Sequence, residues 1–160
     1  MDSIRFIADV HLAKVAKYMR LLGFDTLYFN QIDDSTLLQI AAKEKRYILT
    51  KDRGLAQRSD RVYLVKEKEI KGQIYEILRH FAVKQCEPFT RCLVDNAFLQ
   101  PVSKEEIIDR LPQKVIGWCN KFWICPVCGR IYWHGTHFLR MKKFIDEVCG
   151  EIQARALVKE

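Results

Sequence analysis

Short apolar runs alternate with amphipathic segments through the first half of the chain, and this alternation restricts the fold more than any other feature. Strand-like apolar runs lie at residues 4–8, 25–29, 47–50 and 62–65. Helical spacing of apolar residues is found at residues 12–22, 35–42 and 71–83. Strands and helices that alternate in this way form a parallel sheet with helices on both faces. The sequence therefore predicts an α/β fold, with a three-layer α/β/α domain over residues 1–85.

The second half of the chain has a different composition. All four prolines and all six cysteines follow residue 85, and the apolar stretches between them are short. This pattern is typical of a small, loop-rich module that needs a covalent or metal staple. We predict a second module over residues 86–160.

Three local elements are predicted inside this module. Residues 102–111 have the spacing of a helix, with Ser103 and Glu106 as a capping box. Residues 131–138 resemble a hairpin with glycine in its turn, and residues 138–157 have the pattern of a closing helix.

The sequence also indicates where the protein works. No apolar run approaches the roughly 18 residues that a membrane span needs, and acidic Asp2 and Asp9 stand where a signal peptide would be basic or uncharged. We therefore expect a cytoplasmic protein with no membrane partner. In that compartment clustered cysteines favour metal binding over disulfides. The net charge of +7 favours a polyanionic partner.

Acidic residues follow three successive predicted strands. Asp9 follows the first, Asp33 and Asp34 follow the second, and Asp52 follows the third. The carboxyl ends of parallel strands share one edge of the sheet, where ligands usually bind. Carboxylates gathered there repel one another unless a hard cation such as Mg²⁺ accepts their oxygens. Such a cation activates water for attack on a phosphodiester, so we expect a metal site that cleaves nucleic acid.

Each of these acids also has a purely structural interpretation. Asp9 and Asp34 could cap helices, and Asp52 could stabilise a turn. Basic residues flank the acids, and the helical pattern predicts that those on residues 12–22 point outward. They could bind phosphates or simply be solvated. These candidate substrate-binding residues are Lys14, Arg20, Lys51 and Arg53.

The most specific local motif is the sequence CPVCG at residues 125–129. A C-x-x-C turn lets two thiolates reach one Zn²⁺ ion, and the glycine relieves the tight backbone. A redox motif is the alternative, but that motif belongs at the start of a helix. Cys92 and Asp95 have the spacing of a second knuckle, and zinc accepts carboxylate oxygen. We expect a site made of Cys92, Asp95, Cys125 and Cys128.

Three further cysteines compete with Asp95 for the fourth position. Cys86, Cys119 and Cys149 could each ligate the metal, although a small buried apolar role is the simpler expectation. The fourth ligand therefore stays open at this point.

Together these motifs resemble the Mut-seven C-terminal RNase domain, a PIN-like ribonuclease domain with an appended zinc ribbon. The matching stretches are residues 6–23, 33–34, 48–55, 73, 88–96, 101–111 and 125–141. The family pattern has cysteine where Asp95 stands, glycine where Val10 and Ala13 stand, and another acid where Gln31 stands. PIN nucleases often carry a fourth acid near the fourth strand, and the sequence offers only Asp60, which lies at the wrong end of that strand.

The resemblance implies a PIN-like fold that cleaves RNA with Mg²⁺ or Mn²⁺. It places Asp9, Asp34 and Asp52 at that metal, with Asp33 as the nearest substitute. The zinc ribbon would be structural and would help to hold RNA.

We therefore expect a metal-dependent ribonuclease with RNA as its partner. The sequence leaves open whether the chain also forms a homo-oligomer. One alternative is a non-catalytic RNA-binding or ribosome-associated module, in which Trp123, Tyr132 and Trp133 stack on bases. Another is a protein-interaction module whose metal sites are vestigial and whose aromatic residues form the core of the ribbon.

Overall fold

The structure, a computed structural model, describes residues 3–158. Its first half contains a four-stranded sheet in the order β2-β1-β3-β4, and every neighbouring pair of strands is parallel. The strands are β1 (Arg5–Ala8), β2 (Asp25–Tyr28), β3 (Tyr47–Thr50) and β4 (Val62–Leu64). The predicted parallel α/β sheet is therefore confirmed, and each predicted strand is found within a residue or so of its expected ends.

Helices cover both faces of this sheet because successive strand residues point in opposite directions. Phe6 and Leu49 pack in one core with the helices on the first face, while Ile7 and Ile48 pack with the helices on the second. The first face carries α1 (Ala13–Leu21) and α4 (Ile70–His80), and the second carries α2 (Asp34–Glu44) and α3 (Arg53–Ala56). A short 3₁₀ turn, η1 (Val10–Leu12), joins β1 to α1.

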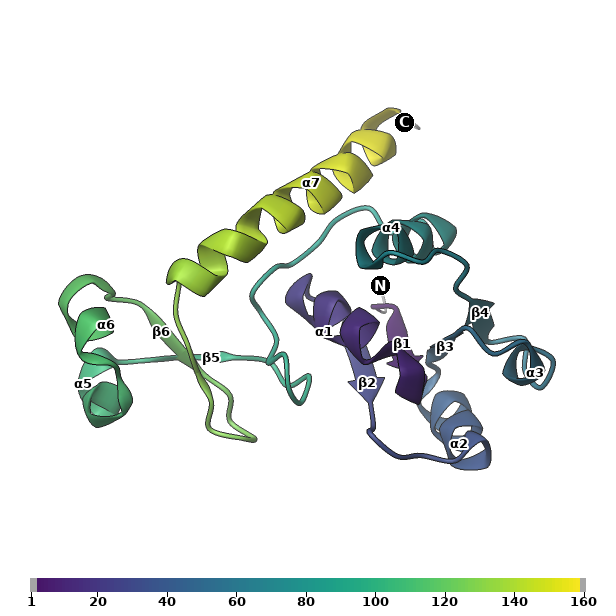
Figure 1. The fold of residues 1–160 in the computed structure, drawn as a ribbon, viewed down its shortest axis with the longest axis horizontal. Helices are drawn as coiled ribbons and strands as arrows, with labels where there is room; N and C mark the ends of the chain where they lie inside the picture. The colour runs from purple at the N-terminus through teal and green to yellow at the C-terminus, as the bar shows by residue number, and fades with distance from the viewer. Residues whose placement is uncertain (1–2, 159–160) are drawn as a thin grey trace.

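The second half forms a small antiparallel sheet (Figure 1). This sheet has its own hydrophobic core. Its strands are β5 (Gln100–Val102), β6 (Phe122–Ile124) and β7 (Ile131–Tyr132), in the order β5-β6-β7. Between β5 and β6 lie α5 (Lys104–Ile107), η2 (Ile108–Arg110) and α6 (Gln113–Trp118). The free cysteine Cys119 is buried in this core, which agrees with its expected apolar role.

The long helix α7 (Thr136–Val158) connects the two halves. It leaves the small sheet and runs back toward α4 (Figure 1). Ile145, Val148 and Ile152 belong to the same core as α1 and α4. No helix among residues 3–158 is both long enough and apolar enough to cross a membrane.

Two local predictions in the second half are wrong. Residues 131–138 do not form a hairpin, because β7 pairs with β6 and Thr136 already begins α7. Ser103 precedes α5 but its side chain caps nothing, so the capping box is not formed. The backbone carbonyl oxygen of Ser103 does accept a hydrogen bond, from the Glu106 N–H at 3.2 Å.

The expectation that the cysteines avoid disulfides is wrong for one pair. Cys86 and Cys149 form a disulfide with a Cα–Cα distance of 5.8 Å. It ties the segment after α4 to α7, and it removes both residues from the competition for a metal. The physical reason is that α7 packs against the first half and so brings Cys149 next to Cys86. No local sequence pattern predicts this contact.

Candidate active site and metal centre

Asp9 lies at the carboxyl edge of the large sheet and is buried, with 8% of its surface exposed. The Thr50 hydroxyl donates a hydrogen bond to Asp9 Oδ2 at 2.7 Å, and Thr50 Oγ1 in turn accepts from the Asp52 N–H at 3.0 Å. The side chain of Asp9 makes no capping hydrogen bond to η1, so its structural interpretation as a helix cap is wrong. Thr50 thus connects two of the predicted catalytic acids, Asp9 and Asp52.

Asp52 is the N-cap residue of α3 instead of part of an isolated turn. Its Oδ1 accepts hydrogen bonds from the Gly54 N–H at 2.8 Å and the Leu55 N–H at 3.4 Å. These bonds fix the direction of an exposed carboxylate at the sheet edge.

Asp33 and Asp34 divide two roles at the start of α2. Asp33 is the N-cap, since its Oδ1 accepts from the Thr36 N–H at 2.7 Å, and this bond holds the pKa of Asp33 below its usual value. The interpretation of Asp34 as the cap is therefore wrong. Asp34 lies in the first helical turn, half exposed, with Oδ2 at 3.8 Å from Nη1 of Arg58.

The four acids share one edge of the sheet, but they are not drawn together at coordinating distance. Within residues 3–158, the one group of at least three potential ligands within 4.8 Å of one another lies elsewhere, in the second half. The sheet edge is an open, partly exposed arrangement in which Asp9 and Asp52 are joined through Thr50 and Asp34 stands apart beside Arg58.

A further acid that the sequence analysis missed stands at the same edge. Val65 continues the pairing of β4, because its N–H donates to the Thr50 carbonyl at 2.7 Å, and the exposed Glu67 follows two residues later. Asp60, the residue considered from the sequence, precedes β4 and so belongs to the opposite edge. The direction of the strand was the signal that pointed to Glu67.

The predicted substrate-binding cations separate into two groups. Lys14 is exposed as expected, and Lys51 and Arg53 are exposed as well. The expectation that Arg20 points outward is wrong, because only 4% of its surface is exposed. Its Nε donates to the Thr26 carbonyl at 2.8 Å, and its Nη1 donates to the carbonyls of Leu93 and Val94 at 3.0 and 2.9 Å. The second half covers this side of α1, which helical periodicity cannot reveal.

The cysteine-rich group contains the four residues predicted as zinc ligands. One ligand atom from each of Cys92, Asp95, Cys125 and Cys128 lies within 4.8 Å of the others. The sulfurs of Cys92 and Cys128 are 3.7 Å apart, and Cys125 Sγ is 3.1 Å from Asp95 Oδ2. Asp95 thus occupies the fourth corner, instead of any of the three competing cysteines.

The two halves of this group have the same backbone pattern. The Cys92 N–H donates to the Ala97 carbonyl at 2.8 Å, and the Cys125 N–H donates to the Arg130 carbonyl at 2.9 Å. The Asn96 N–H bonds back to the Cys92 carbonyl as the Gly129 N–H bonds back to that of Cys125. Residues 92–96 are therefore a second knuckle with Asp95 at the position equivalent to Cys128.

The chemistry of this donor set fits a zinc ion. Three sulfurs and one carboxylate oxygen match the tetrahedral coordination that structural zinc sites use. Burial, together with the neighbouring Asp95 and thiol groups, raises the pKa of Cys128 to about 12. A crowded set of donors that resists ionisation is stabilised as thiolates when a cation neutralises it.

A polar network fastens the first knuckle to the large sheet. The Asn96 side chain donates to Asp25 Oδ1 at 2.6 Å and accepts from the Thr26 N–H at 3.0 Å. Arg46 Nη1 also donates to Asp25 Oδ1, at 2.7 Å. Burial opposes ionisation of Asp25, but the bonds from Arg46 and Asn96 outweigh it and hold the pKa of this carboxyl below its usual value.

A parallel α/β sheet with acids at its carboxyl edge, joined to a small module with a three-cysteine, one-aspartate cluster, defines a mixed α/β protein with a candidate metal centre. The family model described as the Mut7-C RNAse domain matches residues 4–145. The chain belongs to this family, and the resemblance seen in the sequence is confirmed. The family indicates a nuclease-type function on RNA. Comparisons with curated proteins and with solved structures gave no match.

Proposed function

We propose that this protein is a metal-dependent ribonuclease whose catalytic centre is the acidic edge of the large sheet. The observation that carries the proposal is the hydrogen-bonded chain from Asp9 through Thr50 to Asp52 in a chain of the Mut7-C RNAse family. Thr50 is fully buried, and its hydroxyl bonds both the Asp9 carboxylate and the backbone N–H of Asp52. A fixed pair of carboxylates at a sheet edge suits a hard divalent cation.

In this proposal Asp9, Asp52 and Asp34 hold Mg²⁺ or Mn²⁺, with Asp33 as the nearest substitute and Glu67 as an additional acid. A cation held there would supply Lewis-acid chemistry: it would polarise the scissile phosphate and lower the pKa of an attacking water. Thr50 and the N–H groups of Gly54 and Leu55 orient the carboxylates of Asp9 and Asp52. The exposed cations position the phosphates of the RNA backbone by charge. They are Lys14, Lys51, Arg53 and Arg58.

The proposed role of zinc is structural. Held by Cys92, Asp95, Cys125 and Cys128, it would close both knuckles of a zinc-ribbon module over residues 86–160, beside a PIN-like domain over residues 1–85. Arg20 and Asn96 bond the first knuckle to β2 and to the end of α1, so this module supports the large sheet directly. The cytoplasm is the proposed site of action.

One observation favours a second candidate function. Asp34 is paired with Arg58 and stands apart from Asp9 and Asp52, an arrangement that suits a non-catalytic RNA-binding or ribosome-associated protein. Such a protein would bind RNA in a salt-sensitive way and would leave it intact.

The experiment is incubation of labelled RNA with the full chain, with and without Mn²⁺. Asp52→Asn should abolish cleavage and preserve folding, because asparagine is an equally good N-cap for α3. Asp60→Asn is the matched control, since it neutralises an exposed acid at the opposite edge of the sheet. Cleavage by the Asp52→Asn variant at the wild-type rate would refute the assignment, and absence of cleavage by the wild type with Mn²⁺ would favour the second candidate.

A further inference from the structure

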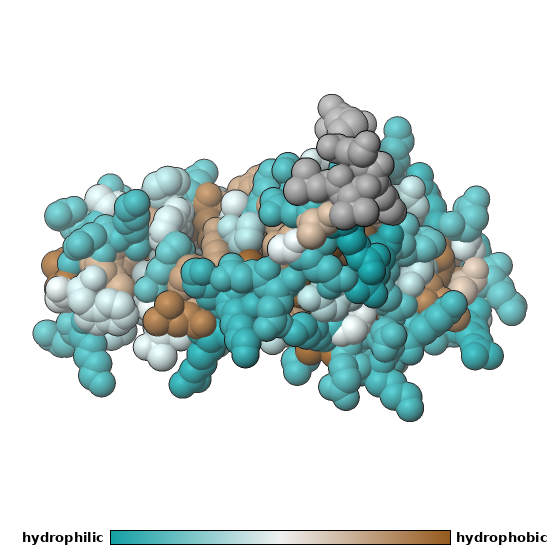
Figure 2. Space-filling model, turned by 90° about the horizontal axis from the view of Figure 1, so that it is seen from above, coloured by the Kyte–Doolittle hydropathy of each residue, from teal (hydrophilic) through white to brown (hydrophobic). Residues whose placement is uncertain are grey.

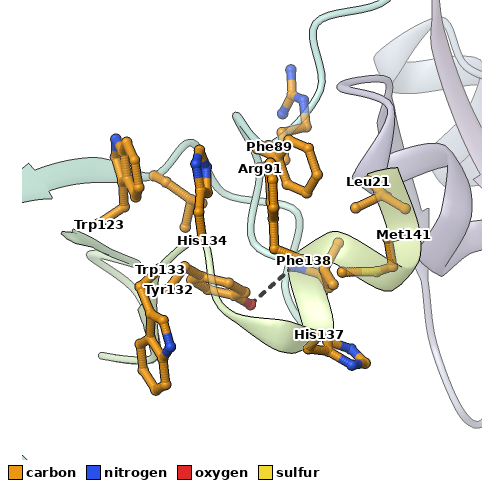
Figure 3. A pocket seen from close by; sticks show the side chains of 12 residues that line it. Leu21, Phe89, Arg91, Trp123, Tyr132, Trp133, His134, His137, Phe138 and Met141 are labelled. Carbon is orange, nitrogen blue, oxygen red and sulfur yellow. Dashed lines mark hydrogen bonds between the residues drawn. The ribbon is translucent and has the colours of Figure 1, made fainter. Parts of the chain in front are cut away.

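A row of stacked rings lies between the small antiparallel sheet and the helices α1 and α7. Trp123 and His134 stack at 4.9 Å with 25° between their planes, and His134 and Phe138 stack at 3.8 Å with 17°. Phe89 extends the row beyond Phe138 at 4.3 Å. Figure 3 shows Trp123 and His134 standing side by side, with Phe138 and Phe89 further to the right, toward α7. The rings border a cavity of about 90 Å³ whose wall also includes Arg91.

A second hollow, of about 510 Å³, lies on the other side of the same segment. Trp133 points toward it and away from Trp123 (Figure 3). Its outer wall carries Trp118, which is 57% exposed, and the exposed Lys114. Tyr132, Trp133 and His137 line both hollows, so the two are neighbouring parts of one aromatic surface.

The charge of this surface has one sign. Neither hollow has an acidic residue in its lining. Exposed Lys114 contributes a free positive charge, and Arg91 contributes one whose guanidinium also bonds the Gly23 and Asn96 carbonyls. Burial and the nearby cation Lys121 hold the pKa of His134 below its usual value, so near neutral pH its imidazole is an uncharged flat ring. In the space-filling view of Figure 2, apolar residues interrupt an otherwise hydrophilic face.

We propose that these two hollows form a binding track for the unpaired bases of single-stranded RNA. Bases offer flat faces that stack on aromatic side chains regardless of sequence, and the backbone follows positive charge. An acidic protein segment would need only the cations, and an apolar segment would need only the rings. In duplex RNA the bases are already stacked on one another, so exposed rings gain little there. The inference deepens the proposed ribonuclease function by naming its substrate class, and it rests on RNA being the partner.

The test measures fluorescence anisotropy of a short labelled oligouridylate bound to the full-length Asp52→Asn variant, without added Mg²⁺ or Mn²⁺ and without chelator. Under these conditions the RNA is not cut and the cysteine cluster is left undisturbed. Adding Trp118→Ala or Trp123→Ala should weaken binding roughly 5- to 150-fold each, the range that loss of one stacking ring produces. Trp118→Phe, which keeps a ring, should restore most of the affinity.

Tyr47→Ala is the matched control, because Tyr47 is an aromatic residue 37% exposed at the amino end of β3, away from the track. It should leave binding unchanged, and circular dichroism should show every variant folded. Equal affinity of Trp118→Ala and its parent would overturn the track, as would failure of the parent to bind the oligouridylate or an equal loss of affinity for a duplex. Cleavage by the wild type with Mn²⁺ is read separately, so the track can fail while the ribonuclease proposal stands.

Discussion

Asn96 and Gly129 occupy equivalent positions at the ends of the two knuckles, with φ angles of 74° and 78°. Both residues are in the left-handed region, which glycine enters freely and asparagine more readily than other residues with side chains. The asparagine is used for more than its backbone, since its amide also bonds to Asp25 and to the Thr26 N–H. One residue therefore closes a knuckle and attaches it to the large sheet.

Replacing Asn96 should separate these two roles. Asn96→Gly keeps the backbone angle but loses two side-chain hydrogen bonds, which we expect to cost about 1–3 kcal/mol of unfolding free energy. Asn96→Ala loses the same bonds and, unlike the glycine variant, keeps a Cβ in the left-handed region without a polar side chain to stabilise it there, so it should cost about 1 kcal/mol more. Urea denaturation of the three proteins measures both steps, and equal stability of the Gly and Ala variants would contradict the backbone role.

Asp95→Ala should weaken binding of the zinc ion that we propose for the cysteine cluster. Losing even a residue that merely supports a ligand lowers metal affinity by about 10- to 100-fold, and loss of a ligand should cost at least as much. Zinc content after dialysis against a competing chelator measures the effect. Asp109→Ala, an exposed acid of the same half, should retain zinc as the wild type does, and full retention by Asp95→Ala would assign the fourth position to another group.

The Asp25 carboxyl should make stability depend on acidic pH. Its pKa in the folded state lies below the ordinary value of 3.8, so its contribution is present above about pH 4 and is lost as the pH falls below that value. Asp25→Asn should therefore destabilise the protein at pH 7, by about 1–3 kcal/mol, and the difference from wild type should shrink near pH 3. Thermal unfolding at both pH values provides the measurement. A constant difference would mean that hydrogen bonding to the charged form of Asp25 is unimportant.

Arg20 and Lys14 should respond in opposite ways, although both are cations of α1. Arg20→Ala removes donors from three backbone carbonyls and should lower the unfolding free energy by about 2–4 kcal/mol. Lys14→Ala changes an exposed side chain and should stay within about 0.5 kcal/mol of wild type, while weakening RNA binding at low salt. Denaturation and RNA-binding measurements on both variants test this difference. A stable Arg20→Ala protein with weakened RNA binding would show that Arg20 binds RNA instead of supporting the fold.

The amino-acid sequence by itself determined the parts of this protein that depend on local pattern. Alternating strand and helix periods fixed the parallel sheet and the edge to which Asp9, Asp33, Asp34 and Asp52 belong. The spacing of Cys92 and Asp95 predicted a second knuckle, since a knuckle is a short backbone pattern with its own hydrogen bonds. Family membership could also be anticipated, because its motifs are contiguous.

Tertiary structure alone decided what depends on contacts between distant segments. Periodicity assigns Arg20 to the outer face of α1 but cannot know that residues 93 and 94 cover that face. In the same way, the return of α7 across the first half pairs Cys149 with Cys86. Burial and partner choice are properties of the packed chain, because they depend on which surfaces meet after the local elements have formed.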